Sequence, residues 1–145
     1  EALKGETVGG GLGMAVAADI RIARKDSGKV GLPEVALGVL PGTGGTQRLV
    51  RLVGKPTAIQ MMAEGTTFGF DDALRHGIIN EVYEVENIVI DGIDASDAPD
   101  FCDAFITSAS IRKFDGACRK ASEEELDFIM EDTDLFCQKL EEAIY

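Results

Sequence analysis

The sequence predicts an α/β fold, in which short strands alternate with helices over roughly the first 85 of 145 residues. An apolar segment at 2–8 has the pattern of a strand and is followed by three glycines at 9–11. A helical run of small residues and another strand come next. A second glycine-rich turn at 41–46 leads into further helical segments, and an amphipathic segment follows at 122–144. With 45% hydrophobic residues, the chain can bury a core without disulfides or metal.

Glycine and proline set the element boundaries in the first part of the chain. Pro33 should end a strand, Pro56 suits a first helical position, and Gly54, Gly65 and Gly77 should each end a helix. The expected strands are 2–8, 20–23, 30–32 and 78–85, and the expected helices are 11–18, 47–53, 55–64 and 70–76.

The second part, 86–145, is expected to hold an exposed acidic loop and then a helical region, beside a core region at 1–85. Ser122 and Glu125 form a capping box that starts a predicted helix over 122–144. The apolar face of that helix needs a partner; it comprises Leu126, Ile129, Met130, Phe136, Leu140 and Ile144. Asp91, Asp94 and Asp97 lack the ligand pattern of a calcium loop and are assigned to solvated loop.

The triplet Gly9, Gly10 and Gly11 allows another group to approach the backbone closely, and the N–H groups at the following helix start would attract an electron-rich group. No dinucleotide fingerprint and no phosphate-binding loop with its lysine is present. The functional interpretation is an oxyanion hole for a carbonyl compound. The structural alternative is a tight turn that lets helices pack closely.

Glu34 is a candidate proton carrier, because apolar residues flank it on both sides and apolar surroundings disfavour a charged carboxylate. The alternative is a surface glutamate at a helix start. His76 is the only histidine, which excludes a Ser-His-Asp arrangement elsewhere, and it is expected to cap a helix at the surface.

The net charge of −12 comes from the second part: residues 1–83 carry nine acidic and nine basic side chains, and residues 84–145 carry 17 and five. This charge argues against nucleic acid and anionic membranes as partners. The chain shows no membrane span or leader, and three cysteines without metal spacing (Cys102, Cys118 and Cys137) suggest reduced thiols. A cytoplasmic protein without metal or resident cofactor is therefore expected.

Two long motifs carry a family resemblance: Gly-Gly-Gly followed by Ala-Ala-Asp-Ile-Arg-Ile-Ala at 9–23, and Leu-Pro-Glu-Val-Ala-Leu-Gly-Val-Leu-Pro-Gly-Thr-Gly-Gly-Thr-Gln-Arg-Leu at 32–49. With 52–55 and 72–82, they make residues 3–84 resemble the enoyl-CoA hydratase/isomerase (crotonase) superfamily. The resemblance implies the later part of a crotonase-like β/α spiral, without its N-terminal half, followed by C-terminal helices.

The resemblance also implies roles for individual residues. Glu34 corresponds to the acid/base glutamate, and the Gly10 N–H corresponds to one of two oxyanion-hole donors, the other lying in the half that is absent from this sequence. Substrate contacts would come from Gly9, Gly11, Leu32, Pro33, Pro41 and Gly42. The implied ligand is an acyl-CoA thioester, with CoA as part of the substrate, and Lys4, Arg24, Lys25 and Lys29 are candidates for its phosphates.

One position departs from the hydratases of this family: Gly13 stands where they carry a second glutamate that helps to hold water. Three hypotheses follow: a hydratase/isomerase-type enzyme, an isomerase working with one glutamate, and a non-catalytic fragment. Gly42, where hydrolase relatives carry an aspartate, argues against hydrolase and dienoyl isomerase activity. The family also implies a homo-oligomer, a trimer or dimer of trimers, with C-terminal helices packed across subunits.

Overall fold

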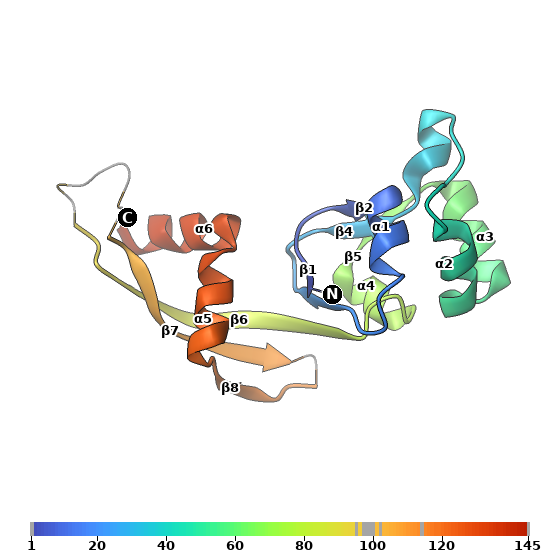
Figure 1. The fold of residues 1–145 in the computed structure, drawn as a ribbon. Helices are drawn as coiled ribbons and strands as arrows, with labels where there is room; N and C mark the ends of the chain where they lie inside the picture. Colours follow the sequence, from blue (N-terminus) through green and yellow to red (C-terminus); the bar gives the residue numbers. More distant parts are fainter. Residues whose placement is uncertain (1, 95, 97–100, 102, 114, 145) are drawn as a thin grey trace. The chain divides into compact units, whose positions relative to one another are not determined.

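The computed structural model describes residues 2–94, 96, 101, 103–113 and 115–144, and the chain forms two units, Glu1–Tyr83 and Glu84–Tyr145 (Figure 1). The elements up to the end of the first unit are β1 (Ala2–Leu3), β2 (Thr7–Val8), α1 (Gly10–Ala15), β3 (Ile22–Arg24), β4 (Lys29–Gly31), the 3₁₀ helix η1 (Pro33–Leu37), α2 (Gly45–Val53), α3 (Lys55–Glu64), β5 (Thr67–Gly69), α4 (Phe70–Arg75) and the start of β6 (Glu81–Asp91). The second unit continues β6 and adds β7 (Phe105–Lys113), β8 (Cys118–Lys120), α5 (Glu123–Met130) and α6 (Thr133–Ile144).

The first unit pairs its short strands in two sets. β1, β3 and the first residues of β6 are parallel neighbours, with Ala2 opposite Ile22 and Ile22 opposite Glu81. β2 is parallel to β4, and β5 is antiparallel to β4. The single strand predicted over 2–8 is therefore wrong, because Gly5, at φ +73°, turns the chain between two sheets.

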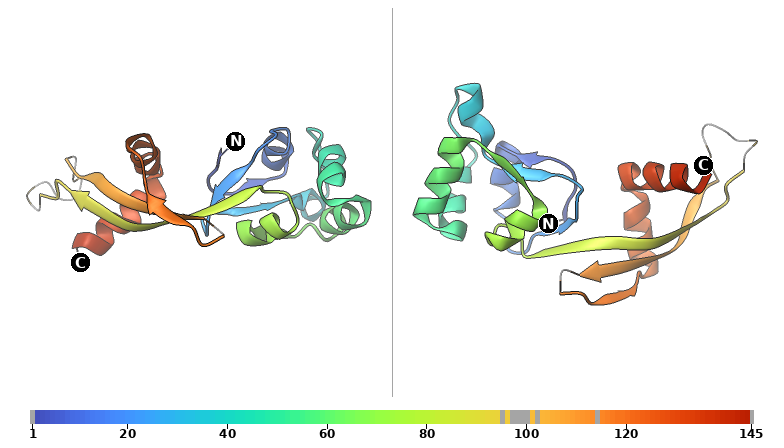
Figure 2. Two further views of the ribbon diagram at one scale, coloured as in Figure 1. Left: turned by 90° about the horizontal axis from the view of Figure 1, so that it is seen from below. Right: turned by 180° about the vertical axis from the view of Figure 1, so that it is seen from behind.

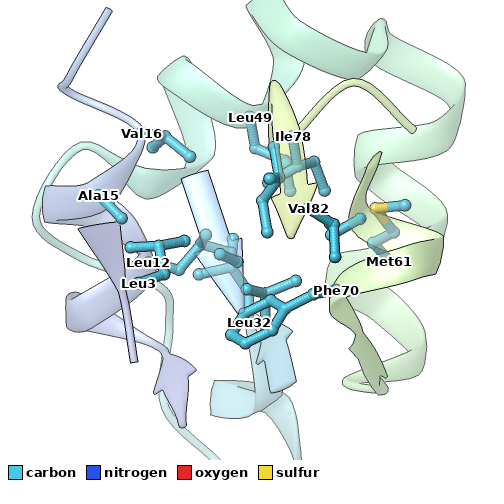
Figure 3. Close-up of a cluster of buried hydrophobic side chains, with 14 of the residues drawn as sticks. Leu3, Leu12, Ala15, Val16, Leu32, Leu49, Met61, Phe70, Ile78 and Val82 are labelled. Atoms are coloured by element: carbon cyan, nitrogen blue, oxygen red, sulfur yellow. The ribbon is translucent and has the colours of Figure 1, made fainter. Parts of the chain in front are cut away.

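The core of the first unit takes one or two buried apolar residues from each of β1, α1, β3, β4, α2, α3, α4 and β6. Its largest fully buried side chains are Leu12, Val30, Leu32, Leu49, Ile78 and Ile79. Figure 3 shows Leu12, Leu32 and Phe70 pointing into a common cluster, with Leu49 and Ile78 beside it. Full burial of such a side chain contributes about 1.5–3 kcal/mol each. This cluster fixes the positions of α1, of the residue before η1, and of α2.

A buried cation connects two distant segments of the same unit. The Arg21 side chain donates hydrogen bonds to the backbone carbonyls of Ala18 and Ile78, and the residue is only 3% exposed. The Arg21 backbone N–H also donates to Oδ1 of Asn80 at 2.8 Å. Arg21 therefore holds the segment after α1 against the segment that enters β6.

In the second unit, the predicted acidic loop is wrong for 86–91 and 105–113, which are strands. Arg112 on β7 donates two hydrogen bonds, of 2.8 and 2.7 Å, to the carboxylate of Glu86 on β6. Val85, Ile88 and Ile90 of β6 pack against the core of this unit. Asp91 ends β6, Oδ1 of Asp94 accepts a 2.8 Å hydrogen bond from the Ser96 backbone, and Asp97 lies outside the described residues.

The helix predicted over 122–144 is two helices, α5 and α6, which Figure 2 shows meeting at an angle. Asp132 lies between them, and its Oδ1 accepts a 3.3 Å hydrogen bond from the Leu135 N–H at the start of α6. Ile129 and Leu135 are buried against Ile106 and Ala109 of β7. Four residues of the predicted apolar face, Leu126, Ile129, Met130 and Phe136, belong to this cluster, whereas Leu140 and Ile144 are half-buried outside it.

The predicted capping box is confirmed at the start of α5, where the Glu125 N–H donates to Ser122 Oγ and the Ser122 N–H donates to the Glu125 carboxylate. Arg119 also donates two hydrogen bonds to this carboxylate, at 2.6 and 2.7 Å. The pKa of Glu125 is lowered from 4.5 to about 2, mainly by the Arg119 guanidinium and secondly by the Ser122 N–H.

This lowered pKa makes one contribution to stability dependent on pH. A carboxylate with a lowered pKa stabilises the fold above its unfolded value, and the contribution is lost as the pH falls from about 4.5 to about 2. Glu125→Gln keeps the capping geometry but loses the charge. We expect it to lower the free energy of unfolding at pH 7 by about 0.2–1 kcal/mol, because the pair is partly exposed. The difference from the unaltered chain, measured by denaturant unfolding, should vanish near pH 2; a constant difference would contradict this account.

None of the described helices is long and apolar enough to cross a membrane. Cys118 and Cys137 are exposed free thiols, and Cys102 lies outside the described residues. His76 ends α4 as expected, with its ring edge-on to Phe68 at a centroid distance of 5.8 Å. Within the described ranges, no three His, Cys, Asp or Glu side chains are placed to hold a metal ion.

Candidate active site

The glycine triplet forms the turn from β2 into α1. Gly9 adopts φ +56° and ψ −126°, a conformation that favours glycine, and its N–H donates to the Gly31 carbonyl at 2.9 Å. The Gly9 carbonyl accepts from the Gly13 N–H at 3.0 Å, so the helix begins inside the triplet. Gly10 is the first helical residue and is exposed, and an N–H at that position has no partner within the helix. Its amide therefore takes no part in the hydrogen bonds within α1.

Glu34 lies next to this turn. Leu32 is held in the core, Pro33 begins η1, and Gly38, at φ +69°, closes it, so the backbone of Glu34 is fixed on both sides. A methyl group on Gly9 would lie 3.3 Å from Oε1 of Glu34. The carboxyl group thus occupies the space that a side chain at Gly9 would need, one residue from the Gly10 amide.

The other carboxyl oxygen of Glu34, Oε2, is buried and has no hydrogen-bond partner among the described residues. A buried polar atom without a partner costs about 1–3 kcal/mol, so native proteins rarely retain one without a use for it. Oε2 of Glu34 is therefore shielded from solvent, although the neighbouring side chains of Val35 and Leu37 are themselves exposed.

The remaining predicted contact residues differ in their access to such a ligand. Gly11 has open space around its α-carbon, Pro33 and Pro41 are half-buried, and Gly42 is exposed. Leu32 is only 1% exposed and packs in the core. The Leu32 side chain thus fixes the start of η1 in the core, and a substrate contact at this residue stays a prediction.

Gly13 faces the turn before α2. A methyl group on it would lie 3.2 Å from the carbonyl oxygen of Thr43, 3.3 Å from its Cβ and 3.5 Å from the Gly45 nitrogen. Gly13 is buried and allows α1 to approach the start of α2 closely. Close helix packing thus occurs at Gly13, outside the triplet for which it was the alternative, while Gly9 lies against Glu34 and Gly10 is exposed.

Two residues at this turn were not singled out from the sequence. Arg48 Nη1 donates hydrogen bonds to the carbonyls of Thr43, at 2.8 Å, and Gly13, at 3.1 Å. Thr43 has φ +54°, and its Oγ1 would lie 3.5 Å from a methyl group on Gly10. The glycines on both sides of Thr43 predict a tight turn there, but they do not indicate which residues the turn contacts.

The basic residues considered for CoA phosphates lie on different strands. Arg24 ends β3 and Lys29 begins β4, in two separate sheets, while Lys4 follows β1 and Lys25 follows β3. The structure thus brings the Glu34 carboxyl group next to Gly9 and the Thr43 hydroxyl next to Gly10, at successive positions of one turn.

Comparison with known proteins now adds to this geometry. The profile of the enoyl-CoA hydratase/isomerase family matches residues 1–98, which is more than half of the chain. The chain belongs to this family. The resemblance seen in the sequence is therefore confirmed. The matched residues include the whole first unit, which contains Gly10 and Glu34.

Curated relatives match about two thirds of the chain. The alpha subunit of the fatty acid oxidation complex of Pseudomonas putida (strain GB-1) is 44% identical over 93 residues, 64% of this chain and 13% of that protein. The corresponding subunit of Pseudomonas entomophila is 45% identical over the same length.

Solved structures of the family match just over half of this chain. An enoyl-CoA hydratase from Geobacillus kaustophilus matches with 55% identity and a TM-score of 0.53, over 54% of this chain and 30% of that one. An enoyl-CoA hydratase from Thermoplasma volcanium matches with 40% identity and a TM-score of 0.53, over 56% and 32%. The chain thus spans about an eighth of these curated relatives and about a third of these structures.

Proposed function

We propose that this chain acts on acyl-CoA thioesters as an enoyl-CoA hydratase/isomerase-type protein, with Glu34 transferring protons and the Gly10 N–H stabilising the thioester oxygen. The observation that carries the proposal is the Glu34 carboxyl group: its Oε1 lies against Gly9 at the start of α1, and its Oε2 is buried without a hydrogen-bond partner in the described part of the chain. Family membership supports the substrate class.

The chemistry follows from the two groups. The Glu34 carboxylate takes a proton from the carbon next to the thioester carbonyl, and the electron pair of the broken C–H bond moves onto the carbonyl oxygen as an enolate. The Gly10 N–H donates to that oxygen as its charge grows, and a donor so placed is worth about 3–4 kcal/mol. The proton on Glu34 then returns to a carbon of the acyl chain, which restores the thioester.

A specific observation favours double-bond isomerisation as a second candidate. Gly13 supplies no second carboxylate to hold water, and Thr43 occupies the adjacent space. With one acid/base group, the proton removed beside the carbonyl can return two carbons further along, which converts a 3-enoyl thioester into a 2-enoyl thioester without water.

The proposal is tested by incubating the 145-residue chain with a 3-enoyl-CoA and, separately, with a 2-enoyl-CoA, and following product formation by mass-resolved chromatography. Conversion of the 3-enoyl compound alone supports the isomerase, and hydration of the 2-enoyl compound supports the hydratase. No conversion, together with no binding of acetoacetyl-CoA by calorimetry, would overturn the proposal and favour a non-catalytic fragment.

We also propose that the first unit is covered by further protein, as in a homo-oligomer. Leu37 and Leu40 are 77% and 90% exposed, and Met14, Ile20 and Val39 are also exposed. Several large apolar side chains exposed in one unit are typical of a surface that is buried in an assembly. Analytical ultracentrifugation should give a mass of three or six chains; a monomer at micromolar concentration would contradict this.

A further inference from the structure

We infer that the second unit binds a second copy of this chain, with strand β8 of one copy adding to the outer edge of β6 in the next copy. The inference concerns residues 84–145 and does not rest on the reaction at Glu34. Two sheet edges, a groove between β6 and α6, and an uneven distribution of charge carry it.

The sheet of the second unit ends in an exposed strand. Its strand order is β1, β3, β6, β7 and β8, so β8 has a strand neighbour on one side only, and its antiparallel ladder with β7 places Lys120 opposite Ser110. All three residues of β8 are exposed, and Figure 1 shows this strand beside β7 at the border of the sheet. β8 therefore presents a short row of backbone groups to which another strand can add.

β6 has an edge of the same kind. Only residues 81–83 pair with β3, although β6 is 11 residues long. The Val89 carbonyl accepts a 3.2 Å hydrogen bond from Thr107 Oγ1 of β7, so the backbone of Val89 faces β7. Because backbone groups alternate between the two edges of a strand, those of Ile88 and Ile90 face away from β7. No strand within the described ranges pairs with β6 on that side.

A groove beside this edge limits the length of the strand that can add. It lies between residues 85–88 of β6 and Lys139, Glu142 and Ala143 of α6, and its volume is about 700 Å³. Asn87 adopts φ +52° and interrupts the regular strand within the groove. Pairing is disrupted at such a position, so a short strand fits better than a long one. With three residues, β8 has a suitable length.

The two sides of the sheet carry opposite charge. Beyond Tyr83, β6 and α6 together hold six carboxylates and one basic residue: Glu84, Glu86, Asp91, Asp134, Glu141 and Glu142, with Lys139. β7 and β8 hold four basic residues and no carboxylate: Arg112, Lys113, Arg119 and Lys120. The basic side of one copy therefore complements the acidic groove of another.

Lys120 and Glu142 are the charges that docking brings together. The Arg119 guanidinium is already bonded to Glu125 of its own chain, at 2.6 Å, which leaves Lys120 as the other cation of β8. The Glu142 side chain is 53% exposed on the groove wall and accepts a hydrogen bond from Lys139 at 2.6 Å. A carboxylate accepts several donors, so it can also bind an incoming ammonium group.

Like charges disfavour the symmetric arrangements. β6 against β6 of another copy would bring the acidic residues of both copies together, and β8 against β8 would do the same with the basic residues. Only β8 against β6 joins opposite charges. This contact is heterologous, so each copy can bind one neighbour on each side, in a closed ring or an open chain.

The first test is cysteine cross-linking in the full 145-residue chain. Cys102 and Cys137 are replaced by serine, so that Cys118 of β8 is the remaining native thiol. Val89→Cys then adds a thiol to β6, at a residue that is 48% exposed. Ser108→Cys is the matched control, because Ser108 is exposed on the interior strand β7.

On oxidation with copper phenanthroline, Val89→Cys should form disulfides between residue 89 of one copy and Cys118 of another at least about tenfold faster than the control forms disulfides. Each copy has a thiol at both edges, so the products should form a ladder of dimers, trimers and longer chains. Equal rates in the two variants, or disulfides that join only residue 89 to residue 89 by peptide mass spectrometry, would overturn the inference.

The second test reverses the charges at the contact. Glu142→Lys and Lys120→Glu should each weaken self-association by at least about threefold in sedimentation equilibrium, because like charges replace an exposed pair of opposite charges. An equal mixture of the two variants should restore association, since each edge then meets an opposite charge. Asp127→Lys makes the same change in net charge as Glu142→Lys on the exposed face of α5, and it should not weaken association.

Three results of the charge test would also overturn the inference: an equal loss with Asp127→Lys, no recovery on mixing, or an unaltered chain that stays monomeric. Assembly through the exposed apolar side chains of the first unit alone is recognised because Glu142→Lys leaves it unchanged, and that result contradicts the contact as well. None of these measurements requires conversion of a thioester, so failure of the proposed function is a separate outcome.

Discussion

Glu34→Gln should lower the turnover of an enoyl-CoA thioester by about 10²–10⁴, the range typical of losing a general acid/base. The amide has the shape of the carboxyl group but does not carry a proton between carbons. Because Oε2 of Glu34 has no partner among the described residues, the substitution breaks no hydrogen bond known at that atom. The free energy of unfolding should therefore change by less than about 0.5 kcal/mol.

The matched control for this prediction is Glu6→Gln, which changes an exposed glutamate of the same unit outside the turn that holds Glu34. Steady-state rates and denaturant unfolding should be measured for both variants. Unchanged turnover in both variants would show that Glu34 takes no part in the reaction. A large loss of stability in Glu34→Gln would instead assign it a structural role.

Gly28→Ala should destabilise the first unit by about 3 kcal/mol or more. A methyl group on Gly28 would lie 2.0 Å from the carbonyl oxygen of Gly5 and 2.2 Å from its carbonyl carbon. Both atoms are backbone, so no side-chain rotation can relieve the contact, and the turn between β1 and β2 would have to move. Overpacking of this kind typically costs about 1–3 kcal/mol and more where backbone must shift.

Gly69→Ala is the control for Gly28→Ala, because Gly69 has extended backbone angles (φ −67°, ψ 169°) and open space around its α-carbon. We expect the control to change the free energy of unfolding by less than about 1 kcal/mol. Equal effects of the two substitutions in urea unfolding would show that Gly5 and Gly28 are not in close contact.

Much of the local structure could be predicted from local chemistry. Gly54 and Gly65 end helices as expected, and the capping box of Ser122 and Glu125 forms, because these features depend on neighbours within a few residues. The strand over 105–113 was missed because its partner β6 is distant in sequence, whereas the break at Asp132 is marked by a local cap that the sequence analysis did not use. The same limit applies to Leu32, which the motif placed at the site and the core holds in its interior.

The sequence by itself determined the family, the glycine turn before α1 and the identity of Glu34 as a candidate, since these follow from residue order and backbone preference. Only the tertiary structure decided that Oε2 of Glu34 is buried beside Gly9, and that Thr43 and Arg48 close the space next to Gly13. The physical reason is that burial and close contact depend on segments brought together by the core. Residues 9–13, 34 and 43–48 meet only after α1, η1 and α2 have packed around Leu12, Leu32 and Leu49.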